Sequence, residues 1–309
     1  MKALLLLAFG GPGSLEEVEP FLIRLFRGRS ASAQQIERVK ERYALIGGSS
    51  PLRAITEAQA KALERRLNRA KVAFVSYVGM RYGHPLIEEA LKEILRDGIH
   101  EIVALPMAPF RSRESTGAYI DEVKRVLKEI GNGLDVSFVE GWHCHHLFIE
   151  AIREKIVEAL SEFRPGSRKR VHLLFTAHSL PRAIVEQDPY VDDMEESVRK
   201  VLEGMEALSN LPWSIAFQSK GRSSEEWIGP EVESVLTGLS GRGIREVLVI
   251  PIGFVSDHIE ILYDIDILFQ KKAESLGMVL KRTRSLNTSE LFIEALAQAV
   301  EERIGRERS

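Results

Sequence analysis

The apolar residues of this chain fall into two kinds of pattern that alternate along it. Short uninterrupted apolar runs are typical of strands buried on both faces of a parallel sheet. Longer stretches, such as 55–67 and 85–98, place apolar residues three or four positions apart, which is the spacing of an amphipathic helix. The pattern predicts an α/β protein. The expected strands lie at 3–9, 72–80, 98–110, 171–175, 213–221 and 247–254.

Parts of the pattern occur twice. The similar segments, in one order, are 4–12 with 172–181, 72–80 with 213–221, and 98–110 with 243–254. Three pairs in the same order indicate two similar βα domains with parallel sheets and helices on both faces. We predict domains at 1–165 and 166–286, and a C-terminal helix at 287–309 that packs back on the first domain. Ligand sites of such folds lie at the carboxyl ends of the strands, so we expect a site between the halves.

Composition narrows the class of protein further. The chain has 309 residues, of which 44% are hydrophobic and 28% charged, and its net charge is −3. This balance gives no electrostatic reason to expect nucleic-acid binding. The single cysteine, Cys144, excludes an internal disulfide and a cysteine-rich metal cluster. No apolar run is long enough to cross a bilayer. We expect a cytoplasmic monomer.

Carboxylates follow the apolar run at 247–254. Asp257, Glu260 and Asp264 are spaced i, i+3 and i+7, which predicts one helical face with Asp257 at the N-cap, and His258 lies beside them. The start of a helix after a sheet strand is a common place for a site. Carboxylates there suit a divalent cation or the removal of a proton. Ordinary capping of a solvated helix is the alternative.

His178 ends the apolar run of the second half. An isolated histidine is more often a packing residue than a catalyst. Here, however, His178 and the carboxylates are both expected at strand ends of one domain. We therefore expect the imidazole and Glu260 to meet across a cleft wide enough for a flat ligand. Such a pair can bind a divalent cation or accept a proton near neutral pH.

Other polar segments have two interpretations each. His143, Cys144 and His145 could hold a soft metal, but adjacent residues rarely point at one ion, so we favour the start of a helix with capping or packed histidines. The glycines at 10–13 lack the spacing of a dinucleotide-binding loop. Arginines near the glycine-serine loop at 47–51 suit the binding of carboxylates, or are simply solvated.

The motifs together resemble those of the ferrochelatase family, whose members insert ferrous iron into a porphyrin. The motifs are AFGGP, YALIGGSSPL, MRYGHPL, STGAY, TAHSLP, QSK…WIGP and SDHIEILYDID, and they occur in the family's order between residues 8 and 266. The resemblance implies two doubly wound, Rossmann-like domains with parallel four-stranded sheets and a porphyrin in the cleft between them. It implies that His178 and Glu260 are the catalytic pair, and that Asp264 joins them on the metal side.

The resemblance also suggests porphyrin contacts and a substrate. The candidate contacts are Phe9, Arg29, Arg42, Tyr43, Ser50, Arg111 and Tyr119. The compact chain, the loop from Arg27 to Tyr43, the glycine-serine loop at 47–51, Tyr119 and the spacing within QSKGRSSEEWIGP resemble the coproporphyrin branch of the family. Several arginines would also suit four propionates. Phe9 departs from this pattern, because some members of that branch have a tyrosine there. Coproporphyrin III is therefore the expected substrate, and protoporphyrin IX is the alternative. Leu268 replaces an acid that is usual in the family.

Ferrous iron is then a substrate, and we expect no organic cofactor and no iron–sulfur cluster. Porphyrin and ferrous iron are the expected partners. Two rival functions remain open. One is the insertion of cobalt into a corrin precursor, although related chelatases tend to have histidines in place of Glu260. The other is a non-catalytic tetrapyrrole carrier.

Overall fold

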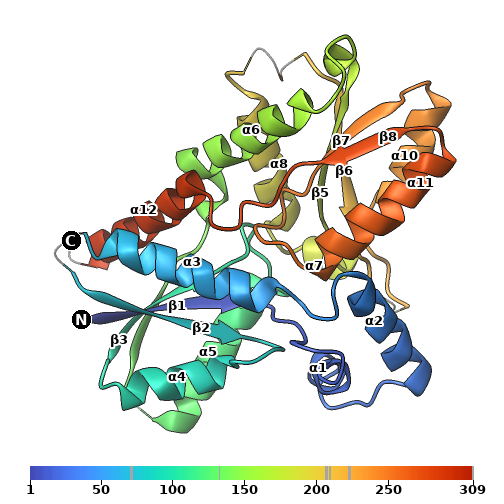
Figure 1. The fold of residues 1–309 in the computed structure, drawn as a ribbon. Helices are drawn as coiled ribbons and strands as arrows, with labels where there is room; N and C mark the ends of the chain where they lie inside the picture. The colour runs from blue at the N-terminus through green and yellow to red at the C-terminus, as the bar shows by residue number, and fades with distance from the viewer. Residues whose placement is uncertain (70–71, 132, 206–207, 209, 222–223, 308–309) are drawn as a thin grey trace.

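Two four-stranded sheets, each with all strands parallel, form the frame of the protein (Figure 1). The computed structural model describes residues 1–69, 72–131, 133–205, 208, 210–221 and 224–307. The first sheet has the order β2-β1-β3-β4. Its strands are β1 (Lys2–Ala8), β2 (Phe74–Met80), β3 (Glu101–Pro106) and β4 (Asp135–Phe138). The second sheet has the order β6-β5-β7-β8. Its strands are β5 (His172–His178), β6 (Trp213–Gln218), β7 (Glu246–Ile250) and β8 (Val279–Arg282).

The two sheets have the same topology, which confirms the prediction of two similar α/β halves. In each, the first strand pairs in parallel with the second and the third. The central strands β1 and β5 are almost entirely buried, as continuous apolar runs require. The edge strands β4 and β8 escape detection in the sequence because they are four residues long and partly exposed.

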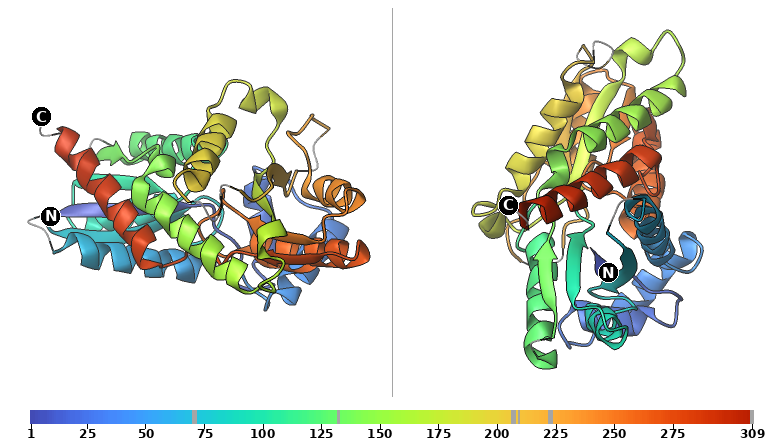
Figure 2. Two further views of the ribbon diagram at one scale, coloured as in Figure 1. Left: turned by 90° about the horizontal axis from the view of Figure 1, so that it is seen from above. Right: turned by 90° about the vertical axis from the view of Figure 1, so that its left-hand side faces the viewer.

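Helices cover both sheets (Figures 1 and 2). The helices between the strands of the first sheet are α1 (Val18–Leu25), α2 (Ala33–Leu45), α3 (Leu52–Leu67), α4 (Ile87–Arg96) and α5 (Thr116–Ile130). The connection to the second contains η1 (Trp142–Cys144), α6 (His146–Ser161) and η2 (Arg168–Arg170). Later helices are α7 (Arg182–Val185), α8 (Tyr190–Leu202), α10 (Val232–Gly241), η3 (Glu260–Phe269), α11 (Gln270–Ser275) and α12 (Glu290–Glu307). No helix in these described ranges is both long and apolar enough to cross a bilayer.

One apolar core joins the two halves. It contains Leu6 of β1, Phe175 of β5 and Leu296 of α12, all fully buried. Helix α12 packs against both α3 and α6, as Figure 1 shows. Each buried leucine or phenylalanine contributes about 1.5–3 kcal/mol through removal of apolar surface from water. This core therefore holds the carboxyl ends of both sheets in a defined relative position. The domain limits themselves stay a prediction.

Candidate active site

His178 and Glu260 lie in contact. His178 is the last residue of β5, and Glu260 is the first residue of η3. The His178 Nε2 and Glu260 Oε1 atoms are 3.4 Å apart, and the two side chains are 31% and 26% exposed. The structure thus brings together the two residues that sequence reasoning paired, and it leaves both open to a ligand.

The two side chains form an ion pair. Burial alone lowers the pKa of His178 and raises that of Glu260, because it disfavours the charged forms. Their mutual attraction and hydrogen bond outweigh burial. The pKa of His178 therefore lies above its ordinary value, and the pKa of Glu260 lies below. His258 adds to the effect on Glu260, since its Nε2 lies 3.7 Å from Glu260 Oε2.

The imidazole of His178 is held by its surroundings. Its Nδ1 is hydrogen-bonded to the carbonyl of Ser179, which leaves Nε2 to face Glu260. The Tyr190 hydroxyl donates to the carbonyl of His178 itself at 2.9 Å. Gly253, after β7, passes so close that a Cβ there would lie 2.7 Å from the Cβ of Ala177. This close approach brings the chain that leads into η3 beside the end of β5.

The expectation that a flat ligand lies between His178 and Glu260 is wrong. A ring in contact with groups on both faces needs a separation of roughly 7 Å, twice the carbon–carbon contact distance. The observed 3.4 Å leaves no such gap. The two side chains thus lie against each other and do not face each other across a slot.

The acidic stripe also differs from its prediction. Asp257 is not the N-cap of η3, which begins after Ile259. Its carboxylate instead accepts hydrogen bonds from Ser285 Oγ at 2.7 Å and Asn287 Nδ2 at 2.8 Å. The helix η3 is a π-helix, whose turns are wider than those of an α-helix. Residues four apart, such as Glu260 and Asp264, therefore share a face.

Asp264 lies near the pair but has its own partner. Ser219, at the end of β6, donates its hydroxyl to Asp264 Oδ2 at 2.5 Å. The pKa of Asp264 is raised to about 6, mainly by burial. The hydrogen bond from Ser219 lowers the pKa, and the negative charge of Glu260 raises it further. Among the described residues, Asp264 does not close into a three-ligand cluster with His178 and Glu260. Its assignment as a metal ligand stays a prediction.

Two residues of this site, Ser219 and Tyr190, were missed by sequence reasoning, and each contacts a member of the site. His258, which the sequence placed beside the carboxylates, contacts Glu260. Their positions depend on how β6, α8 and the loop before η3 pack together. No local pattern in the sequence indicates such contacts.

Tyrosines from the first half of the chain approach the same pair. Tyr43 of α2 and Tyr119 of α5 are buried, with 3% and 5% of their surface exposed. Burial, together with the negative charge of Glu260, raises the pKa of both hydroxyls above the ordinary range. The guanidinium of Arg42 lies 5.2 Å from the ring centre of Tyr263 in η3. Candidate porphyrin contacts on α2 and α5 thus converge on the second half.

The loop after β1 makes close backbone contacts. A Cβ on Gly10, whose φ is +88°, would lie 2.5 Å from the nitrogen of Gly83. A Cβ on Gly11 would lie 2.6 Å from the Cβ of Ser50, whose N–H donates to the carbonyl of Pro12 at 2.8 Å. These approaches require glycine. They place Ser50 directly against the end of β1.

The remaining candidate porphyrin contacts differ in whether other groups of the protein already bind their side chains. Phe9 is 40% exposed just beyond β1, with its ring edge-on to Tyr82 at 4.8 Å. Arg29 is exposed, and its Nε donates to the carbonyl of Phe26 at 3.4 Å. The guanidinium of Arg111 is bound at two points by Asp193 of α8. That ion pair leaves Arg111 poorly placed to take a propionate as well.

The histidine-rich segment begins a helix, as favoured from the sequence. The Nδ1 of His145 accepts a hydrogen bond from the N–H of Leu147 at 3.3 Å, which caps α6. The ring of His145 stacks on that of His146, with centres 4.7 Å apart. His145 is therefore turned away from any ion shared with its neighbours.

The two-domain α/β fold is that of solved chelatase structures. The solved structure of the sirohydrochlorin chelatase SirB from Bacillus subtilis subspecies spizizenii with cobalt is similar, with a TM-score of 0.56. The alignment covers 98% of this chain and 94% of that one at 12% identity, so the likeness shows the fold alone.

Closer relatives identify the family. The family model described as Ferrochelatase matches residues 1–304. The protein named Ferrochelatase from Geotalea uraniireducens is 41% identical, over 99% of this chain and 98% of that protein. A Deinococcus radiodurans protein of the same name is 39% identical, over 96% of this chain and 94% of that protein. The chain belongs to the ferrochelatase family, the enzymes of haem biosynthesis that insert iron into a porphyrin.

Proposed function

We propose that this chelatase inserts ferrous iron into coproporphyrin III, with His178 as the general base. The observation that carries the proposal is the contact between the His178 imidazole and the Glu260 carboxylate, which is partly exposed at the end of β5. A porphyrin must lose two pyrrole protons before iron can take their place. A base that is held in position and partly shielded from water is the group that this step requires.

The hydrogen bonds of His178 support its role as a base. When the neutral imidazole donates Nδ1–H to the Ser179 carbonyl, its lone pair is on Nε2. A pyrrole proton accepted at Nε2 makes the ring positive. The carboxylate of Glu260, 3.4 Å away, stabilises that charge. The proton can then pass to solvent, and the base is ready for the second one.

The approach of ferrous iron is assigned to the carboxylates of η3. Glu260 and Asp264 share one face of this helix, and mixed imidazole and carboxylate ligands suit iron(II). Leu268, four residues further on, packs against the apolar core of the second sheet. The row of carboxylates formed by Glu260 and Asp264 on this face of η3 therefore ends at Asp264. Iron is consumed as a substrate in this scheme.

Unpaired cations support coproporphyrin III, which has four propionates. Arg27, Arg29 and Arg113 are exposed, and their guanidinium groups have no carboxylate partner within the described ranges. Arg42 is partly exposed beside Tyr263. Guanidinium groups bind carboxylates through paired, charge-assisted hydrogen bonds. Protoporphyrin IX has only two propionates and would use fewer of these groups.

An anaerobic assay tests the substrate and the reaction together. The protein is mixed with ferrous iron and either porphyrin, and metallation is followed by absorption. We expect many turnovers per protein molecule, with a higher kcat/KM for coproporphyrin III. A change limited to one equivalent would show a carrier, and a preference for protoporphyrin IX would refute the substrate.

Substitution of His178 tests the proposed base. We expect His178→Ala to lower kcat by about 10²–10⁴-fold, the usual contribution of a general base. His146→Gln is the matched control, because His146 is exposed on α6 and should keep full activity. Near-normal turnover of a folded His178→Ala variant would exclude His178 as the base.

A further inference from the structure

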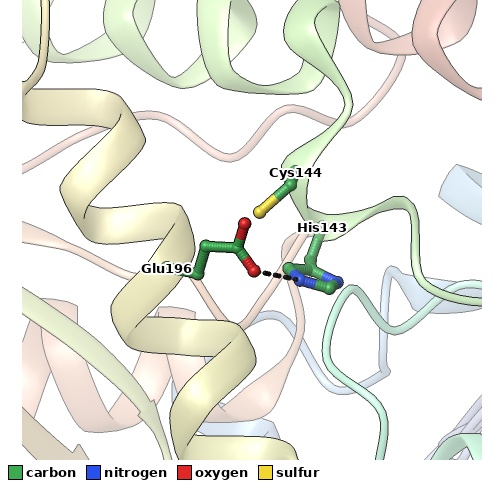
Figure 3. Close-up of side chains that lie close together, drawn as sticks. All are labelled: His143, Cys144 and Glu196. Atoms are coloured by element: carbon green, nitrogen blue, oxygen red, sulfur yellow. Dashed lines mark ion pairs between the residues drawn. The ribbon is translucent and has the colours of Figure 1, made fainter.

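A second group of ligand-type side chains lies apart from the His178–Glu260 pair. His143 and Cys144 of η1 face Glu196 of α8 (Figure 3). One ligand atom from each residue lies within 4.8 Å of the other two. The Nε2 of His143 and the Oε2 of Glu196 are 3.6 Å apart. A nitrogen, a sulfur and an oxygen ligand thus converge from two segments that are distant in sequence.

The ring of His143 is buried, and the nearest charged groups to its Nε2 are the carboxylates of Asp193 and Glu196, at 3.5 Å and 3.6 Å. The residue is 5% exposed, yet neither ring nitrogen has a hydrogen-bond partner among the described residues. Buried polar groups are normally satisfied, so an orphaned imidazole calls for a missing partner. The backbone of His143 is held against α8, since Ser197 Oγ donates to the His143 carbonyl at 2.9 Å.

We propose that a divalent transition-metal ion of the zinc class binds between His143 Nε2, Cys144 Sγ and the Glu196 carboxylate. One imidazole, one thiolate and one carboxylate suit zinc, iron(II) or cobalt(II), whereas magnesium and calcium take oxygen ligands. On binding, the thiol exchanges its proton for the metal, and the proton is released to solvent.

Part of the spacing already suits a tetrahedral site. Metal–ligand bonds of 2.0–2.3 Å place neighbouring ligand atoms roughly 3.3–3.8 Å apart. The 3.6 Å between His143 and Glu196 falls in that range. The Cys144 sulfur lies within 4.8 Å of the other two ligand atoms, so binding an ion requires it to move closer by no more than about 1 Å. The Glu196 side chain is 44% exposed, so a fourth position is accessible to water.

This site is separate from the proposed chelation site. The ring of Phe110 lies between them, 6.5 Å from the His143 ring and 5.9 Å from the Tyr190 ring. Tyr190 in turn contacts the backbone of His178. The bound ion would connect η1, which precedes α6, to α8. It does not depend on the porphyrin reaction proposed above.

Cobalt(II) added to the full chain under reducing, anaerobic conditions tests the site. Thiolate-bound cobalt has a charge-transfer band in the near ultraviolet, and tetrahedral cobalt has intense visible bands. We expect both in the wild-type protein and in His178→Ala, which removes the other candidate site. The conservative Cys144→Ser variant should lose the thiolate band, and Glu196→Gln should bind cobalt at least about tenfold more weakly.

His146→Gln is the matched control, because His146 is exposed next to the same segment and should leave the spectrum unchanged. A spectrum without a thiolate band in the wild type would overturn the proposal. His143 would then be a packed residue whose Nε2 lies 3.6 Å from Glu196 and 3.5 Å from Asp193 without an ion between them. A band that survives in Cys144→Ser, or that disappears only in His178→Ala, would equally refute it.

Discussion

Replacement of Arg111 by alanine would leave a buried carboxylate without its main partner. Arg111 follows β3 and reaches across to Asp193 on α8, whose side chain is 3% exposed. Its Nε and Nη2 donate to the two carboxylate oxygens at 2.9 Å and 2.6 Å, and its backbone N–H donates at 3.0 Å. Alanine at 111 removes the two side-chain bonds and keeps the third.

The expected loss of stability follows from this geometry. Removing one partner of a buried ion pair costs about 3–5 kcal/mol, because the remaining charge stays buried. Two features reduce the cost here. The Arg111 side chain is 46% exposed, so water can enter in its place, and His143 lies 3.5 Å from the same carboxylate. We therefore expect Arg111→Ala to lower the free energy of unfolding by about 2–4 kcal/mol.

The loss should depend on pH. Burial raises the pKa of Asp193, but the hydrogen bonds and charge of Arg111 outweigh burial, so the pKa of Asp193 lies below its ordinary value. A lowered pKa stabilises the folded state above the unfolded-state pKa, and this stabilisation is lost as the pH falls through the folded-state pKa. The difference between wild type and variant should therefore shrink in acid.

Urea unfolding of Arg111→Ala and of the matched variant Arg113→Ala measures the effect. Arg113 is exposed, and its replacement should change stability by no more than about 0.5 kcal/mol. The Michaelis constant for the porphyrin should not change in Arg111→Ala. Unchanged stability with a tenfold higher Michaelis constant would show that Arg111 binds the porphyrin, and would refute the structural role.

Three further outcomes are expected. The kcat/KM for metallation should rise with pH as His178 loses its proton, with a midpoint above 6.5 because Glu260 raises its pKa; a profile without an acid limb would contradict this. Ser219→Ala should raise the pKa of Asp264 further above about 6, as read by carboxyl NMR, because its hydrogen-bond donor is lost; an unchanged titration would exclude that bond. Gly10 and Gly28 both have positive φ, so we expect Gly28→Ala to cost about 1–2 kcal/mol of stability. Gly10→Ala should cost more, because only a Cβ at Gly10 would meet backbone, at 2.5 Å. Equal losses of stability in urea unfolding would exclude the close contact.

The periodicity of the sequence was sufficient for the architecture. Uninterrupted apolar runs mark β1 and β5 because strands buried on both faces need apolar residues at every position. The repeated segments predicted one topology used twice, and the two sheets share it. His178 and Glu260 could be located because His178 ends β5 and Glu260 begins η3, and the buried apolar segment before each of them can be recognised in the sequence.

Side-chain partners depended on tertiary structure. Asp257 has the spacing of a helix cap, but the Ser285 and Asn287 side chains take its carboxylate. The sequence suggested that Arg111 could bind a propionate, but in the folded chain its guanidinium is bound by Asp193.

Local sequence patterns specify which positions are buried, since burial follows the period of the helix or strand. The direction of a polar side chain is decided by the donors and acceptors that distant segments bring to it. For that reason the sequence could place Glu196 on a helix, and only the folded chain could place it beside His143 and Cys144.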